Sequence, residues 1–185
     1  MALTATDLRE GFVVAFHCLG DDAQPTHAYL KGSAGAGVVS LSQDPNEAGA
    51  QWTVHVSAAS GVLSFQCGEG GFLDGRTLDC TVGLAPSAQA PFIGAQWKVT
   101  DLPNPDQGGF NHVSLQTQGN LGDPNQGQCP FGFLDGRTAL SDGSVGLARS
   151  TEEPFSGTHW ELLLSPVFPG EGGSSGDGGA DSRPH

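Results

Sequence analysis

Three short segments of the chain alternate apolar and polar residues, which is the pattern of a β-strand with one buried face. The face expected to be buried carries Val14, Phe16 and Cys18 in the first segment, Leu63, Phe65 and Cys67 in the second, and Val113, Leu115 and Thr117 in the third. These segments predict three strands, each of which begins a similar stretch of sequence.

A repeated heptapeptide follows the second and third of these strands. Gly-Phe-Leu-Asp-Gly-Arg-Thr occupies residues 71–77 and again 132–138, and a weaker copy, Ala-Tyr-Leu-Lys-Gly, occupies 28–32. After each copy comes a short apolar strand, at 38–41, 82–84 and 145–147, and then a strand that contains Trp52, Trp97 or Trp160. Because the three tryptophans recur in register, we expect them in the core.

The repeat therefore predicts an all-β chain of three units with four strands each. A propeller needs more blades, and a solenoid needs terminal repeats with altered outer faces. Closure of twelve short strands into a capped barrel removes most free edges. In these features the chain resembles the β-trefoil superfamily, and within it ricin-B-like and related domains, over residues 8–165. The resemblance implies a β-trefoil with pseudo-threefold symmetry.

The length of 185 residues suits one domain. We place a single β-trefoil domain at 1–168, with repeats at about 8–57, 58–102 and 103–165. Residues 169–185 are rich in Gly, Ser and Asp and hold too few apolar side chains to offset the entropy of ordering. They are expected to form a disordered tail.

Acidic residues number 20 against 7 basic ones, which gives a formal net charge of −13. This charge argues against nucleic acid and against an anionic membrane surface as partners. No apolar run is long enough to insert into a membrane. The N-terminus lacks the pattern of a signal peptide. A cytoplasmic location is the default expectation, with secretion without a leader as the alternative.

Cysteine and histidine positions do not predict a metal site. The four cysteines show no CxxC spacing, and Cys18 and Cys67 fall on the apolar faces of their strands, where we expect buried, small hydrophobic side chains. No nucleophile elbow, phosphate-binding loop or zinc-protease motif is present. We expect no cofactor, no catalytic residues and no enzymatic activity.

The sharpest polar features are the two Asp-Gly-Arg-Thr segments. An Asp-Gly pair after an apolar strand predicts a turn, which an Arg two residues later could stiffen. The other interpretation is a ligand site, since a carboxylate can accept two hydroxyl hydrogen bonds from a sugar. The residues concerned are Asp74, Arg76 and Thr77 in one copy and Asp135, Arg137 and Thr138 in the other.

Resemblance to the ricin-B-like lectins adds a role for the aspartates. In that family an Asp at the end of the second strand of a unit holds sugar hydroxyls, and Asp74 and Asp135 occupy this place. Lys31 stands there in the first copy, so that site is expected to be inactive.

Other positions depart from the lectin pattern. The family's aromatic platform is replaced by Ser42, Ala85 and Ala148, and its Gln two residues before the tryptophan by Ala50, Ala95 and Thr158. Gln51 and Gln96 directly precede their tryptophans and should point to the opposite side of the strand. Phe92 and Phe155 lie in loops before the tryptophan strands, where they could form a substitute stacking face or hydrophobic lids on the barrel.

The leading hypothesis is a carbohydrate-binding, lectin-like module whose partner is a glycan or glycoprotein. One rival is a protein-binding trefoil such as a protease inhibitor, acting through the long segment at 118–130. Another is a structural trefoil without a small ligand. The sequence does not specify the oligomeric state.

Overall fold

The protein is described by a computed structural model in residues 2–20, 28–58, 60–103, 112–119, 132–136, 144–152 and 156–165. These residues form thirteen β-strands and four single-turn 3-10 helices. The predicted all-β class is confirmed. The expected tail at 169–185 lies outside the described residues, and the proposed division into repeats stays a prediction.

Six strands close into an antiparallel barrel. In order around the ring they are β2 (Val13–Cys18), β5 (Trp52–Val56), β6 (Leu63–Cys67), β9 (Trp97–Leu102), β10 (His112–Thr117) and β13 (Trp160–Leu164). Each pairs with the next, and β13 pairs with β2 to complete the ring. The short strand β1 (Ala2–Leu3) also pairs with β13, next to the residues of β13 that pair with β10.

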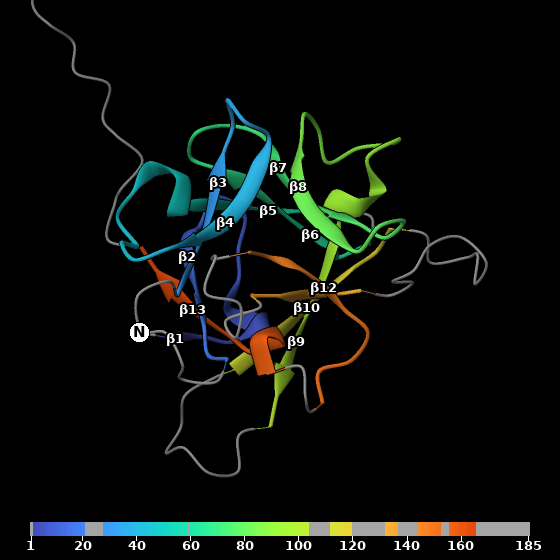
Figure 1. Cartoon of the computed structure of the whole chain (residues 1–185). Helices are drawn as coiled ribbons and strands as arrows, with labels where there is room; N and C mark the ends of the chain where they lie inside the picture. The colour runs from blue at the N-terminus through green and yellow to red at the C-terminus, as the bar shows by residue number, and fades with distance from the viewer. Residues whose placement is uncertain are drawn as a thin grey trace, which may run out of the picture.

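Three hairpins lie against this barrel. They are β3–β4 (Tyr29–Ser33 and Val38–Ser42), β7–β8 (Phe72–Arg76 and Thr81–Ala85) and β11–β12 (Phe133–Asp135 and Gly146–Ala148). The first strand of each hairpin pairs with the barrel strand before it. The hairpins also pair with one another, β8 with both β4 and β12. Figure 1 shows hairpins β3–β4 and β7–β8 side by side above the barrel.

The three tryptophans begin their strands fully buried, as expected. Each indole Nε1 donates a hydrogen bond to the backbone oxygen of the leucine in its own hairpin: Trp52 to Leu30 at 2.9 Å, Trp97 to Leu73 at 2.9 Å and Trp160 to Leu134 at 3.0 Å. The predicted apolar faces of β2, β6 and β10 are buried as well. The tryptophans therefore tie each hairpin to the barrel core.

In the second repeat the Asp-Gly pair does not form a turn, so the prediction of a turn is wrong there. Asp74 and Gly75 lie within β7, paired with Gly83 and Val82. Glycine is required there by packing, because a Cβ on Gly75 would lie 2.9 Å from the Cβ of Thr117 and 3.0 Å from the Trp97 ring. The equivalent Gly32 meets Cys67 and Trp52 in the same way.

A polar side chain at the end of each initial strand connects neighbouring repeats. Thr117 Oγ1 donates to the backbone oxygen of Gly94 at 3.1 Å, and the thiols of Cys67 and Cys18 lie 3.5 Å from the oxygens of Gly49 and Gly157. Cys18 and Cys67 are buried and free, as expected. They act as weak hydrogen-bond donors as well as small core residues.

Candidate functional site

The candidate site lies at the end of β7 and is built on the alternation of that strand. Leu73 and Gly75 face the core, so Asp74 and Arg76 share the opposite face. Arg76 is half-exposed, and its guanidinium lies over Gly83, where a side chain would collide with it. The spacing of the Asp-Gly-Arg segment thus directs one acid and one base to the same surface.

The loop before Trp97 brings an aromatic ring to the same place. Phe92 precedes the 3-10 helix η3 (Ile93–Ala95) as its N-cap residue. Within η3, Gly94 packs so closely on β7 that a Cβ would collide with Asp74 Oδ1 and with the backbone oxygen of Gly75. This close approach positions Phe92 beside the end of the hairpin.

These residues surround a cavity of about 290 Å³, here called the Asp74 cavity. Its lining consists of Asp74, Gly75, Arg76, Thr77, Leu78, Asp79, Pro91, Phe92 and Gly94. Four of the residues singled out from the sequence, Asp74, Arg76, Thr77 and Phe92, therefore meet around one hollow. Leu78, Asp79 and Pro91 were not anticipated, although Leu78 and Asp79 directly follow the heptapeptide.

The electrostatics of the Asp74 cavity depend on partial burial of its acid. The Asp74 side chain is 16% exposed, and its Oδ2 lies 3.6 Å from Nε of Arg76. Burial raises the pKa of Asp74 above its usual value, while the charge of Arg76 and its hydrogen bond act in the opposite direction. Hydrogen bonds from Thr81 lower the pKa of Asp79 at the rim. The cavity thus offers acceptors, a guanidinium donor and an apolar ring.

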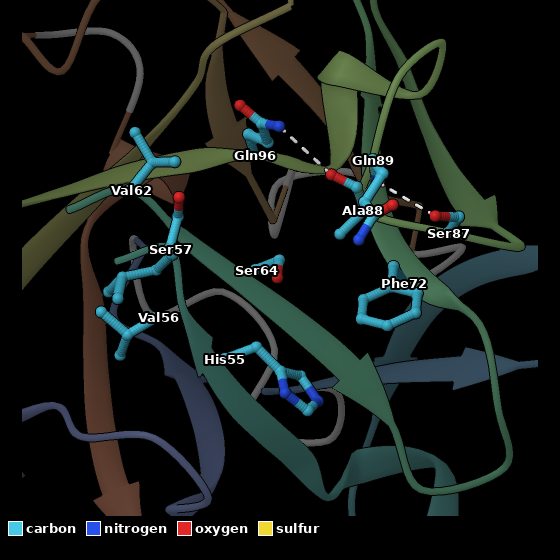
Figure 2. A pocket seen from close by; sticks show the side chains of 11 residues that line it. His55, Val56, Ser57, Val62, Ser64, Phe72, Ser87, Ala88, Gln89 and Gln96 are labelled. Carbon is cyan, nitrogen blue, oxygen red and sulfur yellow. Dashed lines mark hydrogen bonds between the residues drawn. The ribbon is translucent and has the colours of Figure 1, made fainter. Parts of the chain in front are cut away.

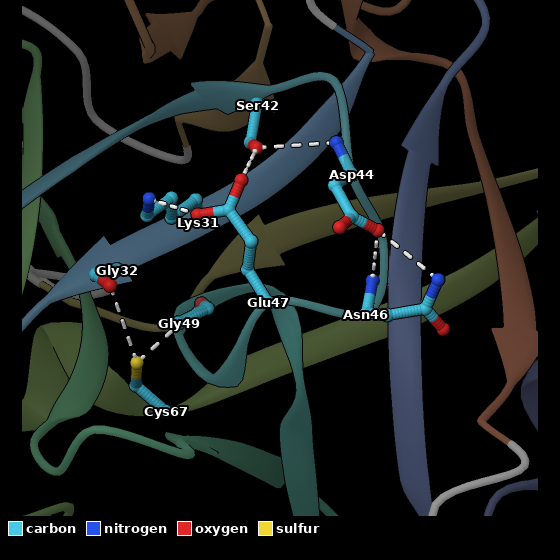
Figure 3. Close-up of polar contacts among 8 residues, drawn as sticks. All are labelled: Lys31, Gly32, Ser42, Asp44, Asn46, Glu47, Gly49 and Cys67. Atoms are coloured by element: carbon cyan, nitrogen blue, oxygen red, sulfur yellow. Dashed lines mark hydrogen bonds and ion pairs between the residues drawn. The ribbon is translucent and has the colours of Figure 1, made fainter.

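The first repeat fills the equivalent place with an ion pair. Lys31 occupies on β3 the position that Asp74 has on β7, and its ammonium group pairs with Glu47, the N-cap residue of η2 (Ala48–Ala50). Glu47 also accepts a hydrogen bond of 2.5 Å from the Ser42 hydroxyl (Figure 3). The pairing raises the pKa of Lys31 and lowers that of Glu47.

The third repeat is described in part. Asp135 ends β11 opposite Gly146, which matches the pairing of Asp74 with Gly83. Arg137, Thr138 and Phe155 lie outside the described residues, as does the segment 118–130 beyond Gly119.

The residues before the tryptophans hold the loops in place. Gln96 Nε2 donates to the backbone oxygen of Ala88 at 3.2 Å, Gln51 donates to that of Pro45, and His159 Nε2 lies 3.0 Å from that of Thr151. These side chains are directed away from the buried indoles, as the alternation predicts. They fix the loops that lead into the tryptophan strands.

Neither a metal-binding cluster nor a membrane-spanning helix occurs in the part of the chain that the structure describes. No group of three or more His, Cys, Asp or Glu side chains in this part of the chain could hold a metal ion. No helix there has the length and apolar character needed to cross a membrane.

Comparison with known proteins shows similarity of fold. No family model matches the chain, and no curated protein matches its sequence. Among solved structures, SeviL bound to an asialo-GM1 saccharide has a TM-score of 0.57 at 12% identity, with 84% of this chain and 98% of SeviL covered. A Culex quiquefasciatus salivary protein of the cysteine and tryptophan-rich family has a TM-score of 0.58 at 16% identity, with 88% and 99% covered.

A larger enzyme contains the same fold as one part. The Clostridium perfringens endo-β-galactosidase that releases GlcNAcα1-4Gal has a TM-score of 0.56 at 12% identity, with 83% of this chain covered. This chain spans 32% of the enzyme's length. The comparisons therefore show that these proteins share the all-β fold of this chain.

Proposed function

We propose that this chain is a non-catalytic carbohydrate-binding module with a β-trefoil fold, and that the Asp74 cavity is one of its sugar sites. The observation that carries the proposal is the convergence of Asp74, Arg76, Thr77 and Phe92 on a single cavity. The partner would be a glycan or a glycoprotein.

The strand pairings support a trefoil. Six strands close a barrel, three hairpins lie against it, and each sequence repeat supplies its strands in the same order. The neighbours support the ligand class, because SeviL was solved with a saccharide and the endo-β-galactosidase acts on a glycan. At 12–16% identity this likeness concerns the fold, so the support for a particular ligand comes from the residues of the site.

The chemistry of the Asp74 cavity suits one sugar ring. An ionised carboxylate can accept hydrogen bonds from two neighbouring hydroxyls, and a guanidinium can donate to a third oxygen. Phe92 offers a face on which the C–H side of a pyranose can stack. A volume of about 290 Å³ lies near the lower end of the range for small-molecule sites.

A second site is proposed around Asp135, which has the same place on β11 that Asp74 has on β7. Arg137, Thr138 and Phe155 would complete it by analogy with the second repeat. Two such sites on one chain would raise the avidity for a surface that presents many copies of the same glycan.

The location of the protein also stays a proposal. Cys80 is disulfide-bonded, and such bonds are typical of oxidising compartments. This observation favours secretion, which was the alternative to the cytoplasmic default. The proposal of secretion would be tested by purifying the protein from its source, unfolding it without reductant and counting its free thiols.

The test of function is a glycan array probed with the wild type and with Asp74→Ala, Asp135→Ala and the double variant. Each single change should weaken binding by about tenfold or more, because a hydrogen bond to a charged group contributes about 1.5–3 kcal/mol. The double change should abolish binding. Lys31→Ala, at the equivalent position of the first repeat, is the matched control and should bind as the wild type does.

Two outcomes would count against the proposal. Unaltered binding by a folded double variant would remove the aspartates as ligand groups. A blank array from folded wild-type protein would contradict the carbohydrate-binding class itself. Circular dichroism and tryptophan fluorescence would establish folding, since all three indoles are buried.

A further inference from the structure

A second cavity, of about 350 Å³, lies at the other end of strand β7 (Figure 2). It is here called the Phe72 cavity. Its lining comes from the end of β5, the start of β6 and the turn between them, from the first residue of β7, and from the loop after β8. It consists of His55, Val56, Ser57, Val62, Leu63, Ser64, Phe72, Ser87, Ala88, Gln89 and Gln96. Val56 and Gln89 are exposed, so the cavity is open to solvent.

The described residues that line the Phe72 cavity include no carboxylate, ammonium or guanidinium group. Its polar groups are serine hydroxyls, two glutamine amides and an imidazole. This lining contrasts with the net charge of −13 of the whole chain and with the Asp74 cavity. A lining without carboxylate, ammonium or guanidinium groups favours an uncharged ligand, because a charged one would lose its hydration without gaining such a partner.

Hydrogen bonds hold the lining in place before any ligand arrives. His55 Nδ1 lies 2.9 Å from Oε1 of Glu10, and its Nε2 lies 3.1 Å from Oε1 of Gln66. On the opposite side, Gln96 Nε2 donates to the backbone oxygen of Ala88, which leaves its carbonyl oxygen to accept from a ligand. Groups fixed in this way lose little conformational entropy on binding.

An aromatic face completes the arrangement. The Phe72 ring is partly buried and lies 5.7 Å from the His55 ring, centroid to centroid. In Figure 2 these two rings lie on one side of the cavity and the amides of Gln89 and Gln96 on the other. A ligand between them would meet an apolar surface on one face and hydrogen-bonding groups on the other.

We propose that the Phe72 cavity binds an uncharged, hydroxyl-bearing ring the size of a monosaccharide. The ring would stack on Phe72, and its hydroxyls would hydrogen-bond to the amides of Gln89 and Gln96. The volume of about 350 Å³ is within the range of small-ligand sites. This site shares its class of ligand with the proposed function but does not depend on the Asp74 cavity.

The experiment is an amide NMR titration of the ¹⁵N-labelled full chain with three neutral probes: methyl β-D-galactopyranoside, methyl β-D-glucopyranoside and methyl α-D-mannopyranoside. At least one probe should cause saturable shifts at residues 55–57, 62–64 and 87–89. Ala88→Leu, which fills the cavity, and Gln89→Ala, which removes an amide, should each weaken this binding by about tenfold. An unchanged spectrum elsewhere would show that each variant folds.

Two controls separate this site from others. Asn46 is an exposed amide in the corresponding loop of the first repeat, so Asn46→Ala should bind as the wild type does. Asp74→Ala should also retain the shifts at 55–57 and 87–89, whatever becomes of the shifts around 74–79.

Two results would overturn the inference. One is the absence of saturable shifts at these residues with all three probes. The other is their loss in Asp74→Ala, which would mean that the sugar binds in the Asp74 cavity and only displaces the loop after β8. In the second case the proposed function would still stand.

Discussion

The first and second repeats share a backbone arrangement but carry different side chains at equivalent positions. In both, a hairpin strand meets a glycine of a 3-10 helix at very short range, and the N-cap residue of that helix faces the third residue of the strand. In the first repeat these two residues are Lys31 and Glu47, which neutralise one another. In the second they are Asp74 and Phe92, which line a cavity. Two side chains therefore separate a position held by an ion pair from one that lines a cavity.

The largest expected effect comes from breaking the shared backbone contact. Gly94→Ala should lower the free energy of unfolding by about 1–3 kcal/mol, because the added methyl collides with Asp74 and with backbone. Gly49→Ala should cost about as much, since its methyl collides with the backbone oxygen of Gly32. Urea unfolding measures both. Gly35→Ala, with nothing within 4 Å, is the control, and equal stability of all three variants would contradict the comparison.

The second effect comes from placing the ion pair of the first repeat at the Asp74 cavity. Asp74→Lys combined with Phe92→Glu should form the ion pair of the first repeat and lower glycan affinity at this cavity by at least about tenfold. The unfolding midpoint should change little, because the same pair is already accommodated in the first repeat. Isothermal titration with a glycan identified on the array would measure the loss. Full affinity in this variant would mean that the cavity is not the site.

The third effect is a difference in pH response between the two positions. The pKa of Asp74 is raised above 3.8 by burial, and that of Glu47 is lowered below 4.5 by its bonds to Lys31 and Ser42. As the pH falls, Asp74 should lose its charge at a higher pH than an ordinary aspartate, and glycan binding should weaken there. The stability contributed by Glu47 is present above pH 4.5 and should be lost only as the pH falls through its lowered pKa. Carboxyl ¹³C shifts would follow both groups, and a pKa of Asp74 at or below 3.8 together with acid-resistant binding would refute this prediction.

The smallest effect is expected at the ion pair itself. Glu47→Gln should lower stability slightly, and the difference from the wild type should shrink in high salt, because partly exposed pairs contribute little and are screened. Thermal unfolding at low and high salt would measure it. The matched change Glu152→Gln alters an exposed loop carboxylate; a larger loss there than at Glu47 would contradict the role of the pair.

Much of the fold could be predicted because the repeat carries long-range information within the sequence itself. The register of Trp52, Trp97 and Trp160 identified the core, and the leucine of each heptapeptide-like segment accepts the indole hydrogen bond. The approach of Phe92 to Asp74 could be anticipated as well, since both lie next to recognisable strands. Phe92 and Asp74 come together through contacts between one hairpin and the loop that follows it in the sequence.

The remaining features depend on contacts between residues far apart in the chain. The local sequence predicted a turn at Asp74-Gly75. In the structure, glycine is required at position 75 because Trp97 and Thr117 pack closely against it. Glu47 reaches Lys31 across 16 residues, and no local pattern marks the two as partners. The Phe72 cavity draws its lining from β5, β6, β7 and the loop after β8. None of these residues forms a motif, so the cavity could not be read from the sequence.

The contacts of Cys18, Cys67 and Thr117 have a consequence for the folding of a single repeat. Each side chain donates to a glycine in the repeat before it, and Cys18 returns from the first repeat to the last. A single repeat cut from the chain would hold an unpaired donor and an unpaired acceptor. Each could find a hydrogen-bond partner only on another copy of the repeat. A peptide of one repeat should therefore stay unfolded alone and acquire structure only as a ring of three. In this sense each repeat depends on its neighbours for the pairing of its own polar groups.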